Sequence, residues 1–163
     1  MAKKIIFLFL ALLFPVAIFI FLKLFGQNEF QVPVLHEQGT ISSPADCPFE
    51  YTTPYRVADT VLASLNLNTN DSLFVFCFDP ALNTVMDRVS EKFGAAPVRL
   101  IAPSGLPDDT DLQRLRKCIL LMEPGSSIAL LDHRRRIRGY YDGSDRDETD
   151  RLMVEIQIIL KQY

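Results

Sequence analysis

The chain has 163 residues, with 17 basic and 20 acidic side chains and a formal net charge of −3. The first 26 residues hold three of the basic side chains and none of the acidic ones, so the remainder carries a net charge of −6. That charge argues against nucleic acid or anionic lipid as the main partner of the remainder, whose length suits one ordinary domain.

A transmembrane helix is predicted near the N-terminus, over Ile5–Phe25. Its first 18 residues, Ile5–Leu22, carry no charge, and about 20 apolar residues in a helix cross a bilayer core of about 30 Å. Lys3 and Lys4 precede the run, and the positive-inside bias keeps that end in the cytoplasm. We therefore expect a single-pass protein of the bacterial inner (plasma) membrane, anchored through residues 5–25, with its C-terminal domain on the periplasmic side.

The alternative is a cleaved signal peptide, which begins with a similar basic start and apolar run. Here the run is longer than the usual ~7–15 residues, and no small-x-small cleavage site follows it. Both interpretations send the remainder across the membrane. Three parts result: an anchor at residues 1–26, a tether and irregular segment at 27–54, and a folded domain at 55–163.

Strands and helices alternate along the folded domain. A short amphipathic helix is predicted within Arg56–Leu67 from its apolar spacing. The wholly apolar run Ser72–Phe78 is typical of a strand buried on both faces. Asp79 and Pro80 then have the pattern of an N-cap followed by proline at the first helical position. The helix that follows has its apolar stripe over Leu82–Phe93 and is expected to end at the next glycine.

The second half of the domain continues the alternation. Its predicted elements, in chain order, are a strand at Val98–Ala102, a helix at Asp109–Lys117, a stretch of open type at Cys118–Met122, hairpin strands at Ser127–Leu131 and Ile137–Tyr141, and a helix at Asp145–Lys161 capped by Ser144. This order predicts an α/β, thioredoxin-like fold, with a central mixed sheet flanked by helices and one N-terminal transmembrane helix.

The C-terminal stretch Ile128–Tyr141 reads IALLDHRRRIRGYY and is followed by DGSDRDETDRLMVEIQIIL. It resembles the SCO/SenC family, which are membrane-anchored, thioredoxin-like proteins that help to deliver copper to cytochrome c oxidase. The resemblance covers Ser127–Tyr163, extends less closely over Leu73–Phe93, and is weak before Ser72. It implies a site made of a C-x-x-x-C pair at a helix start and a histidine before the hairpin, since thiolates bind copper(I) or form a disulfide.

The chain departs from that implied site at all three ligand positions. Asp79 stands where the first cysteine is expected, Asn83 where the second is, and Gly125 (or Pro124) where the histidine is. The resemblance therefore implies a degenerate site with no catalytic residue, no metal and no cofactor. Asp79 and Asn83 lie one helical turn apart and could together touch a hard cation, but a plain N-cap is the simpler interpretation of Asp79.

The three cysteines have no redox-motif spacing. Cys77 lies in the buried strand and is expected to pack as a small apolar group. A disulfide between Cys47 and Cys118 would suit an exported domain. It would close a loop of about 70 residues, worth about 3–4 kcal/mol, and two free thiols are the alternative.

The run His133–Arg138 is strongly basic. It is interpreted as a solvated hairpin turn, with a contact to an acidic partner or to lipid as the alternative. The predicted function is a binding or assembly module, not an enzyme, that acts with a protein partner in the envelope during respiratory-oxidase biogenesis. Two alternatives stay open: a thiol-disulfide oxidoreductase that uses Cys47 and Cys118, and a copper chaperone that uses Cys77.

Overall fold

The structure is a computed structural model that describes residues 2–25, 31–42, 44, 47–65, 67, 73–102 and 109–161. The chain divides into two units, Met1–Gln31 and Val32–Tyr163. Ser72, with which the first predicted strand begins, and residues 27–30 of the predicted tether lie outside the described residues.

In the first unit, the helix α1 (Ala2–Phe25) has 24 residues and contains Pro15. A helix is therefore present over the predicted residues, and it begins three residues earlier than expected. Its described large apolar side chains, among them Phe14 and Phe19, are exposed. Over the described residues, the structure contains no helix that is long and apolar enough to cross a membrane.

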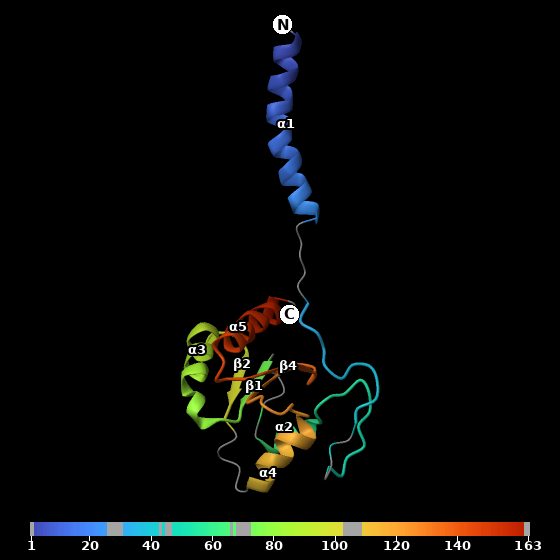
Figure 1. Cartoon of the computed structure of the whole chain (residues 1–163), viewed down its shortest axis with the longest axis vertical. Helices are drawn as coiled ribbons and strands as arrows, with labels where there is room; N and C mark the ends of the chain where they lie inside the picture. The colour runs from blue at the N-terminus through green and yellow to red at the C-terminus, as the bar shows by residue number, and fades with distance from the viewer. Residues whose placement is uncertain are drawn as a thin grey trace. The chain divides into compact units, whose positions relative to one another are not determined.

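The second unit is built on a four-stranded mixed sheet (Figure 1) with the strand order β2-β1-β3-β4. The strands are β1 (Leu73–Cys77), β2 (Val98–Ile101), β3 (Ile128–Asp132) and β4 (Ile137–Tyr141). β1 runs parallel to β2, and β3 runs antiparallel to both β1 and β4. The α/β class, the mixed sheet and the predicted hairpin are thus confirmed.

Helices cover both faces of this sheet. On one face, α3 (Asn83–Phe93) and α5 (Arg146–Lys161) pack on alternate residues of β1 and β3, including Val75 and Leu130. On the other face, α2 (Asp59–Ser64) and the π-helix η3 (Leu115–Ile119), which continues α4 (Asp109–Arg114), pack on Phe74, Phe76 and Leu131. Because side chains of a strand alternate between faces, the wholly apolar run of β1 supplies both cores.

Two predicted helix ends differ in detail. The last helix is capped by Asp145, whose Oδ1 accepts from the Asp147 N–H at 2.8 Å, and not by Ser144. Ser144 instead donates its N–H and its hydroxyl to Asp142 Oδ1. The helix α3 ends at Gly94 as predicted, but with φ −60°, so no left-handed glycine closes it.

The second unit begins at Val32, so most of the segment interpreted from sequence as tether belongs to it. Its backbone bonds to the hairpin through the Leu35 N–H, which donates to Ile137 O at 2.9 Å, and just beyond the segment the Val57 N–H donates to Arg135 O at 3.0 Å. The segment thereby lies beside β4 and its turn, although it has no periodic apolar pattern of its own.

Candidate functional site

The junction between β1 and the following helix is the place where the resemblance implies a metal and redox site. Asp79 has extended backbone angles, and its Oδ1 accepts from the Ala81 N–H at 2.8 Å, while Pro80 occupies the first position of the short helix η1 (Pro80–Leu82). This is an N-cap, as predicted. The carboxylate is therefore already engaged by its own helix.

The other two positions of the implied site lie at the same end of the sheet. Asn83 begins α3 and is exposed. Gly125 sits in the turn before β3 with φ +90°, a conformation that favours glycine. The Phe78 N–H donates to Ser127 O at 2.9 Å, which brings this turn beside the junction. The arrangement thus places an acid, an amide and a glycine where the resemblance implies two thiols and an imidazole.

Cys77 is the nearest sulfur in sequence to this junction. It is buried on the face that α3 and α5 cover, and its Sγ lies 3.6 Å from Asp79 O. Burial raises the pKa of the Cys77 thiol, which disfavours the reactive thiolate. Among the described residues, no group of three His, Cys, Asp or Glu side chains is arranged to hold a metal ion.

A disulfide joins Cys47 to Cys118, with a Cα–Cα distance of 5.5 Å. The predicted bond is confirmed. It ties the irregular segment to η3, the π-helix that carries Cys118. Cys118 is buried and Cys47 is partly buried.

Three tyrosine hydroxyls bond to three successive carbonyls at the end of η3. The hydroxyls of Tyr51, Tyr55 and Tyr140 donate to the backbone oxygens of Cys118 at 2.8 Å, Ile119 at 2.6 Å and Leu120 at 2.7 Å, in that order. Carbonyls at a helix C-terminus lack partners within the helix, so these tyrosines supply them. We call this set of residues, which no sequence pattern indicated, the tyrosine clamp.

Burial raises the pKa values of tyrosines in the clamp. It raises the pKa of Tyr55 to about 12, and it raises the pKa of Tyr140 further. His36 Nε2 lies 3.2 Å from the Tyr140 hydroxyl oxygen. Because that hydroxyl gives its proton to Leu120 O, the imidazole must be the donor in this contact. Burial also lowers the pKa of His36, so the neutral ring is favoured.

A cavity of about 230 Å³ opens beside the disulfide, and we call it the aromatic cavity. Its aromatic walls are Phe49, Tyr51 and Tyr55, with ring centroids 6.5 Å apart for the first pair and 5.7 Å for the second. Arg114 lies over the Phe49 ring at 5.5 Å. The remaining lining residues are Glu50, Thr52, Arg56, Ala58, Val61, Cys118 and Ile119.

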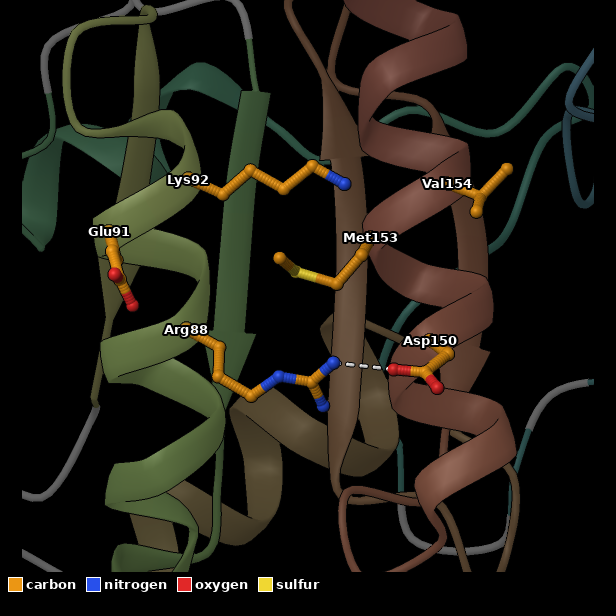
Figure 2. A pocket seen from close by; sticks show the side chains of 6 residues that line it. All are labelled: Arg88, Glu91, Lys92, Asp150, Met153 and Val154. Atoms are coloured by element: carbon orange, nitrogen blue, oxygen red, sulfur yellow. Dashed lines mark hydrogen bonds and ion pairs between the residues drawn. The ribbon is translucent and has the colours of Figure 1, made fainter.

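A second, wider groove of about 510 Å³ lies between α3 and α5. Figure 2 shows Met153 pointing between the two helices, with Lys92 above it and the Arg88–Asp150 ion pair below it. The pair is 2.5 Å long, and both side chains are about half exposed. Exposed pairs of this kind contribute little to stability, and the groove has no aromatic wall.

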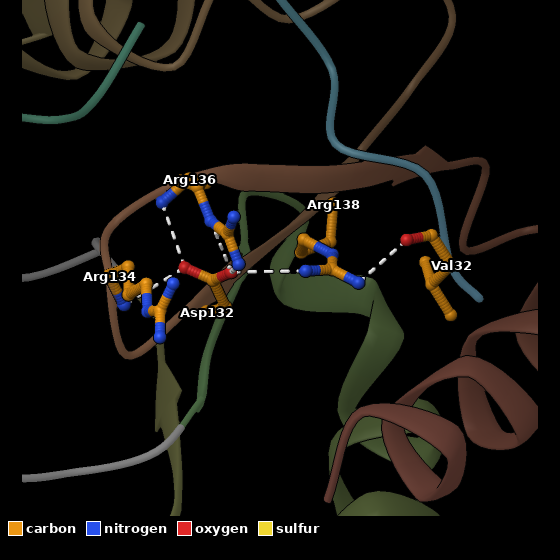
Figure 3. A network of polar contacts seen from close by, with 5 residues as sticks. All are labelled: Val32, Asp132, Arg134, Arg136 and Arg138. Atoms are coloured by element: carbon orange, nitrogen blue, oxygen red, sulfur yellow. Dashed lines mark hydrogen bonds and ion pairs between the residues drawn. The ribbon is translucent and has the colours of Figure 1, made fainter. Parts of the chain in front are cut away.

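The basic run of the hairpin is largely engaged within the domain. Figure 3 shows its centre, the fully buried carboxylate of Asp132. This carboxylate accepts from Arg136 Nε at 2.9 Å and from Arg138 Nη1 at 3.1 Å. Arg138 Nη2 in turn donates to Val32 O at 2.6 Å, where the second unit begins.

The interpretation of this run as a solvated turn is therefore wrong for most of its residues. Arg138 is buried, Arg135 is ion-paired with Asp59, and Arg134 alone among the four arginines is classed as exposed. The first hairpin strand was predicted to end at Leu131, whereas β3 extends to include Asp132. Buried charges persist only with such partners, so the buried Asp132 accounts for two of the four arginines, Arg136 and Arg138.

No family model matches the chain, and comparison with curated proteins and with solved structures gives no match.

Proposed function

We propose that this chain is a membrane-anchored, thioredoxin-like protein of the SCO type that lacks the redox and copper site and acts as a binding or assembly factor in respiratory-oxidase biogenesis. The strand order β2-β1-β3-β4, with β3 antiparallel to the rest, supports the thioredoxin-like plan. The hairpin at Ile128–Tyr141 supports the SCO resemblance.

One observation carries the proposal of binding without catalysis. At the junction where the resemblance implies a nucleophilic thiol, Asp79 is an N-cap and Asn83 is an exposed amide. Neither group is a soft copper ligand or a redox centre. Three cysteines could replace them. Cys47 and Cys118 are joined in a disulfide, and Cys77 is a buried thiol whose pKa is raised.

The proposal also places the second unit at the periplasmic side of the inner membrane, with α1 as its anchor. The exposed Phe, Leu, Ile and Val side chains of α1 support that role, because they would be covered by lipid. The basic Lys3 and Lys4 support a cytoplasmic N-terminus.

The test is a deletion in the bacterial host followed by measurement of cytochrome oxidase activity in isolated membranes. We expect deletion to lower this activity and the full chain to restore it. A Cys77→Ser chain should restore it equally, whereas a chain without residues 1–26 should not. Unchanged oxidase activity after deletion would overturn the assembly role.

The observed disulfide favours one alternative, a thiol-disulfide oxidoreductase that cycles Cys47 and Cys118. Insulin reduction by the purified full chain tests this alternative. Turnover that disappears in Cys47→Ser would support it and contradict the proposal. Copper(I) binding in competition with a chelator, lost in Cys77→Ser, would support a copper chaperone instead.

A further inference from the structure

Two of the three aromatic walls of the cavity, Tyr51 and Tyr55, are held in place before anything binds. The Tyr51 and Tyr55 hydroxyls are bonded to the carbonyls of Cys118 and Ile119, so neither ring can turn freely into the space. The Cys47–Cys118 disulfide fixes the segment that carries them. A site whose walls are already ordered binds without a further entropic cost of ordering them.

The cavity presents ring surfaces and aliphatic groups to its occupant. Both tyrosine protons are used within the domain, and Val61 and Ile119 add apolar surface. Its volume of about 230 Å³ is below the roughly 300–1,000 Å³ of sites that enclose a small molecule. One large apolar side chain is therefore the occupant that its size and surface suit.

Two arginines and one glutamate are described at the cavity, whereas the chain beyond the anchor is acidic. Arg56 lines the cavity and Arg114 lies over Phe49, while Glu50 is the one acidic side chain among the described lining residues. Residues 27–163 carry a net charge of −6. A positive rim on an acidic domain favours an occupant with negative charge beside its anchor.

We propose that the aromatic cavity receives one apolar side chain of an extended, acidic segment of a partner protein. This inference rests on the proposed function as a binding module and names the kind of partner. An extended segment offers its side chain without the bulk of a folded helix, in keeping with other aromatic-walled peptide sites.

The experiment uses the full chain in detergent micelles and three dye-labelled synthetic peptides, followed by fluorescence anisotropy. The first peptide has a central phenylalanine flanked by glutamates, the second has lysines in place of the glutamates, and the third has a central serine between glutamates. We expect the first to bind about tenfold tighter than either of the others. Equal binding of the first two, or no binding of any, would overturn the inference.

Three variants locate the binding. Phe49→Ala, at a side chain that is 40% exposed, should abolish the preference for phenylalanine over serine. Arg56→Glu should reverse the preference between acidic and basic flanks. Val154→Ala, at an exposed position of α5, is the matched control and should bind as the parent chain does. If Phe49→Ala binds like the parent and keeps its near-ultraviolet circular dichroism, the aromatic cavity is not the site.

The peptide and membrane experiments fail independently. Oxidase activity that depends on the chain while no peptide binds would overturn the cavity inference and leave the proposed function. Peptide binding at the cavity in a chain whose deletion leaves oxidase activity unchanged would overturn the oxidase role and leave the docking site.

Discussion

The start of η1 and the end of η3 are both helix termini at which backbone groups need partners from outside the helix. At η1 the partner is local: Asp79 accepts from an N–H two residues later. At η3 the partners are distant, because the hydroxyls of Tyr51 and Tyr55 come from residues 67 and 64 positions away in the chain. The first arrangement is an ordinary cap, whereas the second joins separate parts of the domain.

This difference between the two helix ends indicates which of them is the better candidate for a functional site. The junction at Asp79 is where the SCO resemblance implies chemistry, yet its polar groups serve the helix that they begin. The end of η3 has no counterpart in that resemblance, yet it gathers the disulfide, the tyrosine clamp and the aromatic cavity. The junction and the end of η3 thus lie on the same fold, and the end of η3 is the better candidate for binding.

Removing the disulfide should cause the largest loss of unfolding free energy among the changes considered at the two helix ends. The double variant Cys47→Ser, Cys118→Ser should lose about 3–4 kcal/mol of unfolding free energy, because the unfolded chain regains the freedom that a long covalent loop removes. Urea unfolding of the full chain in micelles, followed by circular dichroism, measures the loss. Addition of a reductant should destabilise the parent chain and leave the double variant unchanged. A loss below about 1 kcal/mol would mean that the irregular segment is held by its other contacts.

Removing single hydroxyls of the tyrosine clamp should give the next largest effect. Tyr140→Phe leaves the Leu120 carbonyl unpaired in the interior and should cost about 1–2 kcal/mol. Tyr51→Phe is the matched control, since Tyr51 is more exposed and water can replace its hydroxyl. The same urea measurement should rank Tyr140→Phe above Tyr51→Phe. Equal costs would mean that the clamp bonds do not depend on burial.

The sequence predicted the regular part of the domain and missed the polar contacts that join its irregular part. The helical spacing over Leu82–Phe93 and the apolar run of β1 are local patterns that predict which side chains are buried. The structure confirms both predictions. The continuation of the predicted helix as η3 has no signal in its own residues, and its last carbonyls bond to hydroxyls from elsewhere in the chain. The buried Asp132 was missed because its partner Arg138 is itself held by a distant contact, the bond from Arg138 Nη2 to Val32 O.

The sequence likewise predicted one part of the candidate site, the disulfide, and missed another, the aromatic cavity. The expected export of the domain suggested a bond between Cys47 and Cys118, and the resemblance directed attention to Asp79, Asn83 and Gly125. Tyr51 and Tyr55, four residues apart and close to Cys47, were the available signal for the aromatic cavity. Their role could not be read from that spacing, because the segment that carries them has no regular secondary structure.

Alkaline pH should weaken the tyrosine clamp before it affects the junction at Asp79. The pKa of Tyr55 is raised to about 12 from a usual value of 10.0, so the folded protein keeps a proton that the unfolded chain loses first. The contribution to stability is full below the unfolded value and falls as the pH rises from about 10 towards about 12. Urea unfolding across this range, with phenolate absorbance as a second signal, measures it. Tyr55→Phe should make the loss less steep, and an unchanged slope in that variant would contradict the assignment.

The smallest expected effect separates the two polar residues at the junction. Asp79→Ala should cost about 1 kcal/mol, because it removes the bond to the Ala81 N–H, whereas Asn83→Ala should stay within about 0.5 kcal/mol, as is usual for an exposed side chain. Asp79→Ser is the control, since serine is also a good N-cap and should recover most of the loss. If Asn83→Ala instead costs as much as Asp79→Ala, and the double variant costs no more than either, the two residues act as one unit. That result would mean that the junction keeps a paired polar site, and the contrast with the end of η3 would no longer hold.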